Sequence, residues 1–292
     1  MARPRGYQVG CINSRVHTKH APDEYLELWR VFARARAPYV WPSSLAVMIG
    51  EAVRRTNEPT DGMFGHFYRF IHLDRDAGWF NILEHKPAER EDLAQIRIPA
   101  NLQPNLRMLP YYFDINRHRL YFISKGAGAA LSPGQVERLL KSLAEHENVV
   151  QRFGAVDIQI ATEIDSVESL LRWPVLRNLS ITLERPNATD FEDDERALRH
   201  LKALGARREV REYAKADDVG TLKPNEEMQA MARVAADNGR VHVEGTDPEG
   251  VSRGADSQHY PWKKNRHFQP ATETLIDAFL GFVRDLFARR RL

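Results

Sequence analysis

Residues 260–268 interleave aromatic and cationic side chains near the end of the chain, in the order Tyr-Pro-Trp-Lys-Lys-Asn-Arg-His-Phe. Lysine and arginine neutralise phosphates and aromatic rings stack on bases, so this composition predicts binding to nucleic acid, either DNA or RNA. We expect the contacts to come from Trp262, Lys263, Lys264 and Arg266. The alternative is structural: Trp262 anchors a long loop to the core while the two lysines stay solvated.

A second group of residues has side chains that bind metal ions. His242 and Glu244 share one face of a predicted strand, and Asp247, Asp256 and His259 follow in the next segment. Histidine and carboxylate ligands suit zinc or manganese, which would make the protein a metal-dependent nuclease or phosphodiesterase. However, no established spacing such as His-Glu-x-x-His occurs, so ordinary surface polar groups are the simpler interpretation, and we expect no metal and no cofactor.

Other signatures of catalysis are weak or missing. Residues 125–128 read Lys-Gly-Ala-Gly between a predicted strand and a predicted helix, where free amide groups could bind a phosphate. The spacing fits no P-loop, and Leu131 occupies the third small position of the dinucleotide pattern. The sequence has no Gly-x-Ser-x-Gly, and Cys11 has no local helper residue. The sequence therefore leaves catalysis open and favours a binding protein.

Hydrophobic periodicity predicts an α+β fold. The N-terminal part is expected to hold helices over about 23–36 and 45–52, a pair of strands over 64–73 and 78–84, and a β-hairpin around residues 116–118. The middle alternates strands and helices, and Ser132-Pro133-Gly134-Gln135 is a capping box that opens one of these helices. The later predictions are strands at 119–123, 156–160, 179–183, near 210–213 and at 240–244, helices at about 165–172, 191–204, 226–236 and 275–287, and a loop over 245–269.

The C-terminal helix is strongly amphipathic and offers a surface for a protein partner or a second copy of the chain. Its apolar side chains recur at helical spacing and comprise Leu275, Ile276, Phe279, Leu280, Val283, Leu286 and Phe287. A protein-interaction module without catalytic activity is therefore a further alternative for the function. Arg30 with Arg34, and the terminal Arg289, Arg290 and Arg291, could extend the cationic surface.

Length and composition indicate a folded protein. The chain has 292 residues, of which 42% are hydrophobic and 28% charged, with a net charge of +2. Two lobes are expected, 1–125 as an N-terminal α+β lobe and 126–292 as a C-terminal α/β lobe, with one continuous domain as the alternative. A single cysteine, no apolar run long enough to span a membrane and no export signal predict a cytoplasmic protein.

The order of several features resembles a bacterial protein family of unknown function. These features are residues 179–187, Leu-Ser-Ile-Thr-Leu-Glu-Arg-Pro-Asn, then Asn238-Gly239-Arg240-Val241 with Gly245, and an aromatic and basic segment before a C-terminal helix. The resemblance covers most of the chain and implies a component of mobile or anti-phage defence loci. On this basis we expect a nucleic-acid-binding protein that acts as the sensor or regulatory component of a bacterial defence system.

Overall fold

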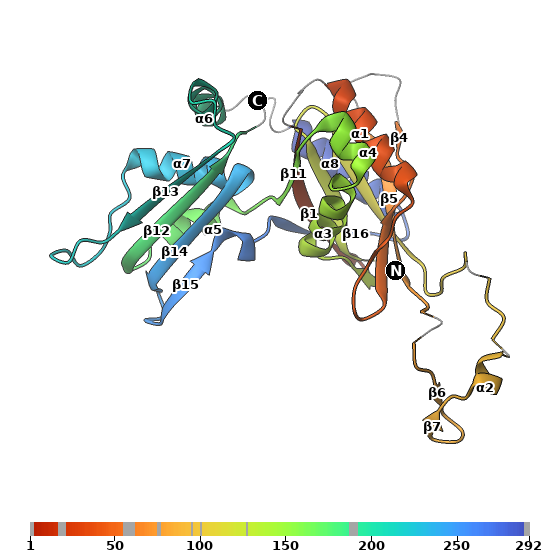
Figure 1. Cartoon of the computed structure of the whole chain (residues 1–292). Coiled ribbons are helices and arrows are strands. Elements are labelled where there is room, and N and C mark those ends of the chain that lie inside the picture. The colour runs from red at the N-terminus through yellow and green to blue at the C-terminus, as the bar shows by residue number, and fades with distance from the viewer. Residues whose placement is uncertain are drawn as a thin grey trace.

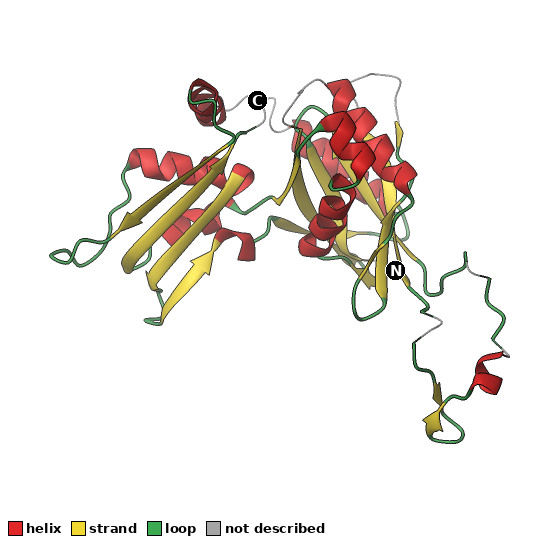
Figure 2. Ribbon diagram, in the orientation of Figure 1, coloured by secondary structure: helices red, strands yellow, loops and turns green. Residues whose placement is uncertain are grey.

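The computed structural model shows two antiparallel β-sheets with helices packed on them, and an arm that projects from the larger sheet (Figures 1 and 2). It describes residues 3–16, 22–54, 62–74, 77–94, 96–99, 101–126, 128–186 and 192–288. The mixture of sheets and helices confirms the predicted α+β class. Among the helices of the described residues, none is both long and apolar enough to cross a lipid bilayer.

The larger sheet is built around β1, whose twelve residues Arg5–Val16 pair along both edges. One edge pairs with β9 (Arg119–Gly126), and the other pairs first with β16 (Lys263–Phe268) and then with β11 (Val156–Ile160). The sheet continues from β9 through β8 (Arg107–Asp114), β5 (Met63–Ile71), β3 (Leu45–Ile49) and β2 (Tyr39–Val40), and short strands β4 (Val53–Arg54) and β10 (Ala129–Ala130) pair with β5 and β9.

Helices cover both faces of this curled sheet (Figure 1). On one face lie α1 (Pro22–Ala35), α3 (Pro133–Ala144) and α4 (Glu147–Phe153), where Trp29 stacks on Phe113 at a centroid distance of 4.0 Å. On the other face lies α8 (Leu275–Ala288), and the Tyr7 hydroxyl donates to the Ala278 carbonyl oxygen over 3.1 Å. Phe279, Leu280, Phe282 and Val283 of α8 are buried within this chain, and a partner for that helix stays a prediction.

The smaller sheet has the order β13 (Arg208–Ala214), β12 (Val175–Glu184), β14 (Gly239–Thr246) and β15 (Ser252–Asp256). The helices α5 (Ile164–Leu171) and α7 (Glu226–Asn238) pack on one of its faces, α6 (Glu192–Ala203) lies against α7, and a short 3-10 turn η1 (Ser257–His259) leads to β16. Alternating apolar residues of β12 and β14 make a separate core with α7, formed by Leu176, Leu179, Ile181, Ala232, Ala235, Val241 and Val243.

The arm leaves the larger sheet after β5 and returns to it at β8 (Figure 1). It contains the two-stranded hairpin of β6 (Phe80–Asn81) and β7 (Lys86–Pro87) and the short helix α2 (Arg90–Ala94). The predicted pairing of residues 78–84 with residues 64–73 is wrong, because β6 pairs with β7 and β5 pairs with β3, β4 and β8. Residues 80–81 thus pair with the segment that follows them, residues 86–87, and not with the strand that precedes them.

Several predicted elements are confirmed, including the helices near residues 23, 132, 192, 226 and 275 and the β8–β9 hairpin. The helix over 45–52 is wrong, since residues 45–49 form β3 between β5 and β2. The loop over 245–269 is wrong as well, because it contains β15 and β16. Strands from both sides of residue 126 share the larger sheet, and the division into 1–125 and 126–292 as lobes stays a prediction.

Candidate functional site

The cationic residues predicted from the sequence lie on β16, at an edge of the larger sheet (Figure 1). Side chains of a strand alternate between the two faces of the sheet, so Lys263 and Lys264 point in opposite directions. Lys263, Arg266 and His267 are exposed, and Lys264 is half-buried. Charged side chains, lysine above all, also protect sheet edges from pairing with other chains, so the cations of β16 alone do not identify a ligand.

Trp262 immediately precedes β16 and faces the protein interior. Its ring meets Tyr121 edge-on at a centroid distance of 5.9 Å, and its backbone N–H donates to the carbonyl oxygen of Ala161 over 2.7 Å. The indole packs against the core of the larger sheet. This position favours the structural alternative for Trp262, in which it anchors the segment.

Two of the three predicted cations have partners within the chain. The Lys264 ammonium lies 2.8 Å from Glu163 Oε1 and 5.6 Å from the centre of the Trp262 ring. The Arg266 guanidinium lies 4.5 Å from the centre of the Phe282 ring in α8, and its Nη1 donates to the carbonyl oxygen of Asn265. Lys263 has no ion pair with a described residue. Lys263 and the exposed part of the Arg266 side chain are therefore the cationic groups of β16 that are most accessible to a ligand.

A hollow of about 730 Å³ opens near the start of β1, beside Phe268 at the end of β16. Arg5 from β1, Arg69 from β5 and Lys125 from β9 line it, together with Gly126, Gly128, Ala129, Ala130, Phe268 and Leu275. No carboxylate is among these described lining residues. Three cations that converge on one hollow without an acid attract an anion.

The surroundings of Arg69 also indicate a positive charge without a compensating negative charge. Its neighbour across the β5–β8 pair is Arg107, so two like charges lie directly opposite each other, which destabilises a sheet. Nε of Arg69 is buried and has no hydrogen-bond acceptor among the described residues. An anion in the hollow would supply the missing negative charge.

We call Arg5, Arg69, Lys125, Lys263 and Arg266 the cationic row: the first three line the hollow, and the last two lie on the neighbouring β16, on opposite faces of the sheet edge. Lys263 and Arg266 were predicted from the sequence, and Lys125 was noted there only as part of a glycine-rich segment. Arg5 and Arg69 were missed, because long-range strand pairing brings them to the hollow and no local motif marks them. Arg289, Arg290 and Arg291 lie outside the described residues.

The predicted metal ligands are only partly brought together. His242 Nδ1 lies 3.6 Å from Asp256 Oδ2, and His242 Nε2 lies 3.7 Å from Glu244 Oε1. Asp256 also forms an ion pair with Arg240, and Glu244 accepts a hydrogen bond from Asn178 over 2.7 Å. Within the described ranges, no three His, Cys, Asp or Glu side chains are arranged to hold a metal ion. These contacts fit a surface network on β12, β14 and β15.

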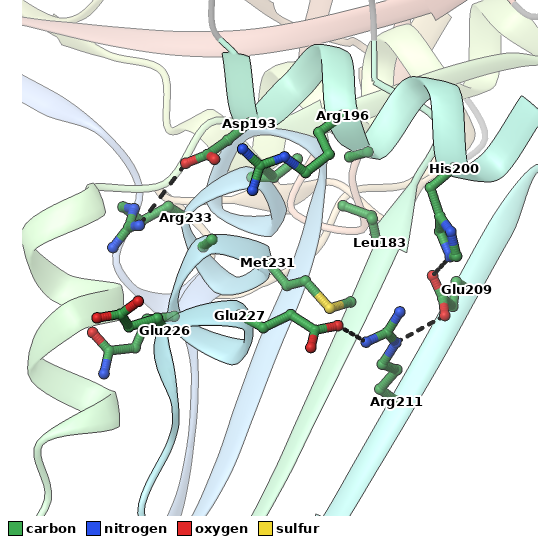
Figure 3. A pocket seen from close by; sticks show the side chains of 14 residues that line it. Leu183, Asp193, Arg196, His200, Glu209, Arg211, Glu226, Glu227, Met231 and Arg233 are labelled. Carbon is green, nitrogen blue, oxygen red and sulfur yellow. Dashed lines mark hydrogen bonds and ion pairs between the residues drawn. The ribbon is translucent and has the colours of Figure 1, made fainter.

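A second hollow of about 710 Å³ lies between α6, α7 and β13 of the smaller sheet, and Figure 3 shows its lining. His200 Nε2 is 3.1 Å from Glu209 Oε2, and Arg211 bridges Glu209 and Glu227 over 2.8 and 2.7 Å. Burial alone would raise the pKa of Glu209, but hydrogen bonds from Arg211 and His200 hold it below its usual value. Acidic and basic side chains both line this hollow, and several of them pair with one another. It therefore attracts an anion less strongly than the hollow lined by Arg5, Arg69 and Lys125.

One family matches the sequence over nearly its whole length. It is described as Domain of unknown function (DUF4747), and it matches residues 5–284. No curated protein matches the chain. The matched region includes both sheets, the arm and the complete cationic row.

Proposed function

We propose that this chain, which belongs to the DUF4747 family of unknown function, binds nucleic acid through the cationic row. The observation that carries the proposal is the hollow in which Arg5, Arg69 and Lys125 converge with no carboxylate among the described lining residues. Phosphate groups would accept hydrogen bonds from the two guanidinium groups and neutralise the three charges.

The shape of the row supports a polymeric anion. β16 extends from the hollow along the edge of the larger sheet, with Phe268 opposite Arg5 and Lys263 opposite Gly10. At about 3.3 Å per residue, its six residues span roughly 17 Å between the hollow and Lys263, which is more than one phosphate group can bridge. A backbone of successive phosphates can contact both ends of the row.

Fluorescence anisotropy with labelled single-stranded and duplex DNA and RNA, across a salt series, tests the proposal. We expect binding that weakens with salt. The triple variant Arg5→Gln, Arg69→Gln, Lys125→Gln should bind weakly and show a smaller salt slope, by about 0.7 to 0.9 for each phosphate that it no longer neutralises. The matched control replaces Arg138, Lys202 and Lys223, which are exposed and lie outside the row. Equal affinities of the two variants would overturn the assignment.

The same titration separates binding from catalysis. We expect the oligonucleotides to keep their length with and without Mn²⁺, because the described residues provide no three-ligand metal site. Metal-dependent shortening of the oligonucleotide that is lost in His242→Ala would instead favour the nuclease alternative. Absence of binding to every form of nucleic acid would leave the interaction module as the better interpretation.

We also propose a biological role as the sensor or regulatory component of a bacterial anti-phage defence system. The support for this role is the whole-chain resemblance described above, together with the proposed affinity for nucleic acid. Phage plating on bacteria that carry the intact locus tests it. Protection should require the gene and should be lost in the Arg5, Arg69, Lys125 triple variant, whereas the Arg138, Lys202, Lys223 control should protect as well as the unmodified protein.

A further inference from the structure

The arm, residues 72–106, has no core of its own. In the described part of this segment every residue is half-buried or exposed, whereas the strands β5 and β8 at its base both contribute buried residues to the core. Ordering a segment of this length costs conformational entropy that buried apolar surface normally offsets. Polar contacts hold the arm in shape: the Leu73 N–H donates to Gln103 Oε1 and connects its two limbs, and the Asn81 amide donates to Asp92.

The arm nevertheless carries a concentration of exposed apolar side chains. Ile82 and Leu83 in the turn between β6 and β7 are 75% and 94% exposed, and they form the tip of the hairpin (Figure 1). Others follow along the arm and at its return to β8, namely Phe80, Ile96, Ile98, Leu102, Leu106 and Met108. Exposed apolar side chains that are concentrated in one segment often mark a contact surface, so the arm is suited to contact another protein.

The arm also contains a hollow of about 390 Å³ that is lined mainly by apolar side chains, together with His72 and Gln103 at its base. Leu73 and Trp79 line it from the limb that leaves the larger sheet, and Leu93, Ile96, Ile98, Pro99 and Leu102 line it from the limb that returns. Ile82 and Leu83 of the same chain do not line this hollow. One arm therefore presents a projecting apolar tip and a separate, mainly apolar hollow, which we call the socket.

We propose that a second copy of this chain docks on the arm, with the Ile82–Leu83 tip of each copy inserted into the socket of the other. A tip and a socket on the same element are self-complementary, which is the requirement for a two-fold symmetric contact, and each dimer then contains two such insertions. Local ion pairs already engage the charges beside the tip, because Lys86 lies 3.0 Å from Glu84 and 2.8 Å from Glu89. The surface that the tip presents to a partner is therefore mainly apolar.

Sedimentation equilibrium of the full chain over a range of concentrations tests this dimer. We expect a monomer–dimer equilibrium that persists at high salt, because apolar contacts are not screened. The variant Ile82→Ser, Leu83→Ser should weaken dimerisation at least tenfold, as should Ile96→Asp in the socket. These side chains are exposed, so the fold should survive, and circular dichroism checks that it does. The control Leu204→Ser, Val251→Ser removes exposed apolar groups outside the arm, after α6 and between β14 and β15, and should leave dimerisation unchanged.

Cross-linking tests the reciprocal geometry. A chain with Leu83→Cys and a second, longer tagged chain with Leu102→Cys are mixed and treated with a short bismaleimide. The mixed product should form in preference to either homodimer, and the native Cys11 is buried and should not react. A monomer at every concentration, a dimer that keeps its affinity in the tip variant, or a dimer that the control variant weakens equally would each overturn the proposal.

Discussion

Arg15 on β1 and Asp157 on β11 lie directly opposite each other, and Arg15 is only 1% exposed. The Arg15 guanidinium reaches from the larger sheet to the smaller one, where Nη1 donates to the carbonyl oxygen of Arg185 and to Oδ1 of Asn238, both over 3.4 Å. Asn13 makes a parallel connection, since its amide donates to the carbonyl oxygen of Asp237 over 2.9 Å. A buried arginine on β1 therefore joins the two sheets.

We expect Arg15→Ala to lower the free energy of unfolding by about 1 to 3 kcal/mol, because it removes the buried hydrogen bonds to Arg185 and Asn238 and takes a positive charge away from the acids nearby. Burial lowers the pKa of Arg15, and Asp157 and Glu184 oppose that shift, which shows that these acids stabilise the charged form. Urea unfolding followed by circular dichroism measures the change. Arg34→Ala on the exposed side of α1 is the control and should change stability by less than about 0.5 kcal/mol. Equal losses would contradict the structural role of Arg15.

Glu184 should make stability depend on pH. Burial raises the pKa of Glu184 above its ordinary value of 4.5, Asp157 raises it further, and Arg15 opposes both. The folded state then binds this proton more tightly than the unfolded state, so the contribution to stability is complete below pH 4.5 and is lost as pH rises through the raised pKa. Glu184→Gln should escape this loss.

Melting temperatures of Glu184→Gln and the unmodified protein, compared from pH 4 upward, test this sign. The difference should shift in favour of the variant as pH rises above 4.5. The exposed Glu212→Gln provides the control and should show no comparable trend. A difference that moves in the opposite direction would mean that the ion pair with Arg208 and the positive charge of Arg15 outweigh burial.

The capping box at the start of α3 predicts a specific stability loss. The Ser132 hydroxyl accepts from the Gln135 backbone N–H over 3.2 Å, and the Gln135 side chain accepts from the Ser132 backbone N–H over 2.9 Å. Ser132→Ala should therefore cost about 1 kcal/mol in urea unfolding. Ser166→Ala in the first turn of α5 is the control, because the N-cap of that helix, Glu163, makes no side-chain cap hydrogen bond. A similar cost for both serines would refute the capping role.

Ser132 and Ser166 also show which helix starts can be predicted from the sequence. Ser132, Pro133 and Gln135 specify a helix start by local chemistry, and the helix begins there. Residues 165–168 show a similar pattern with Asp165 in the N-cap position, yet the N-cap is Glu163 and the helix begins at Ile164. Amphipathic helices such as α1 and α8 were predicted for the same reason, since their side-chain spacing carries the signal within the segment.

Elements defined by distant partners were less predictable. Residues 45–49 form a short apolar run that fits a helix or a strand, and pairing with β5 decides in favour of a strand. β16 reads as a polar loop because most of its side chains are exposed at an edge, so no apolar alternation marks it. The hollow shows the same limit: Arg5, Arg69 and Lys125 lie far apart in the sequence, and only the order of β1, β9, β8 and β5 brings them together.

The opposed pair Arg69 and Arg107 gives a prediction that separates stability from binding. Removing one charge relieves repulsion between cross-strand neighbours, which is worth about 0.2 to 1 kcal/mol. We therefore expect Arg107→Gln to raise the free energy of unfolding by a few tenths of a kcal/mol at low salt, and this gain should shrink as sodium chloride screens the charges. The same variant should bind nucleic acid more weakly if the pair faces phosphate.

Urea unfolding at low and high salt, with and without a single-stranded oligonucleotide, measures both effects on one preparation. The oligonucleotide should stabilise the unmodified protein more than Arg107→Gln, because at a fixed free concentration L a tighter-binding ligand stabilises the folded state more, by RT ln(1 + L/Kd). Arg138→Gln on α3 removes one exposed charge elsewhere and should show neither effect. If Arg107→Gln lowers stability at low salt, the two arginines do not repel each other in the folded protein, and the case for an anion beside Arg69 loses its electrostatic basis.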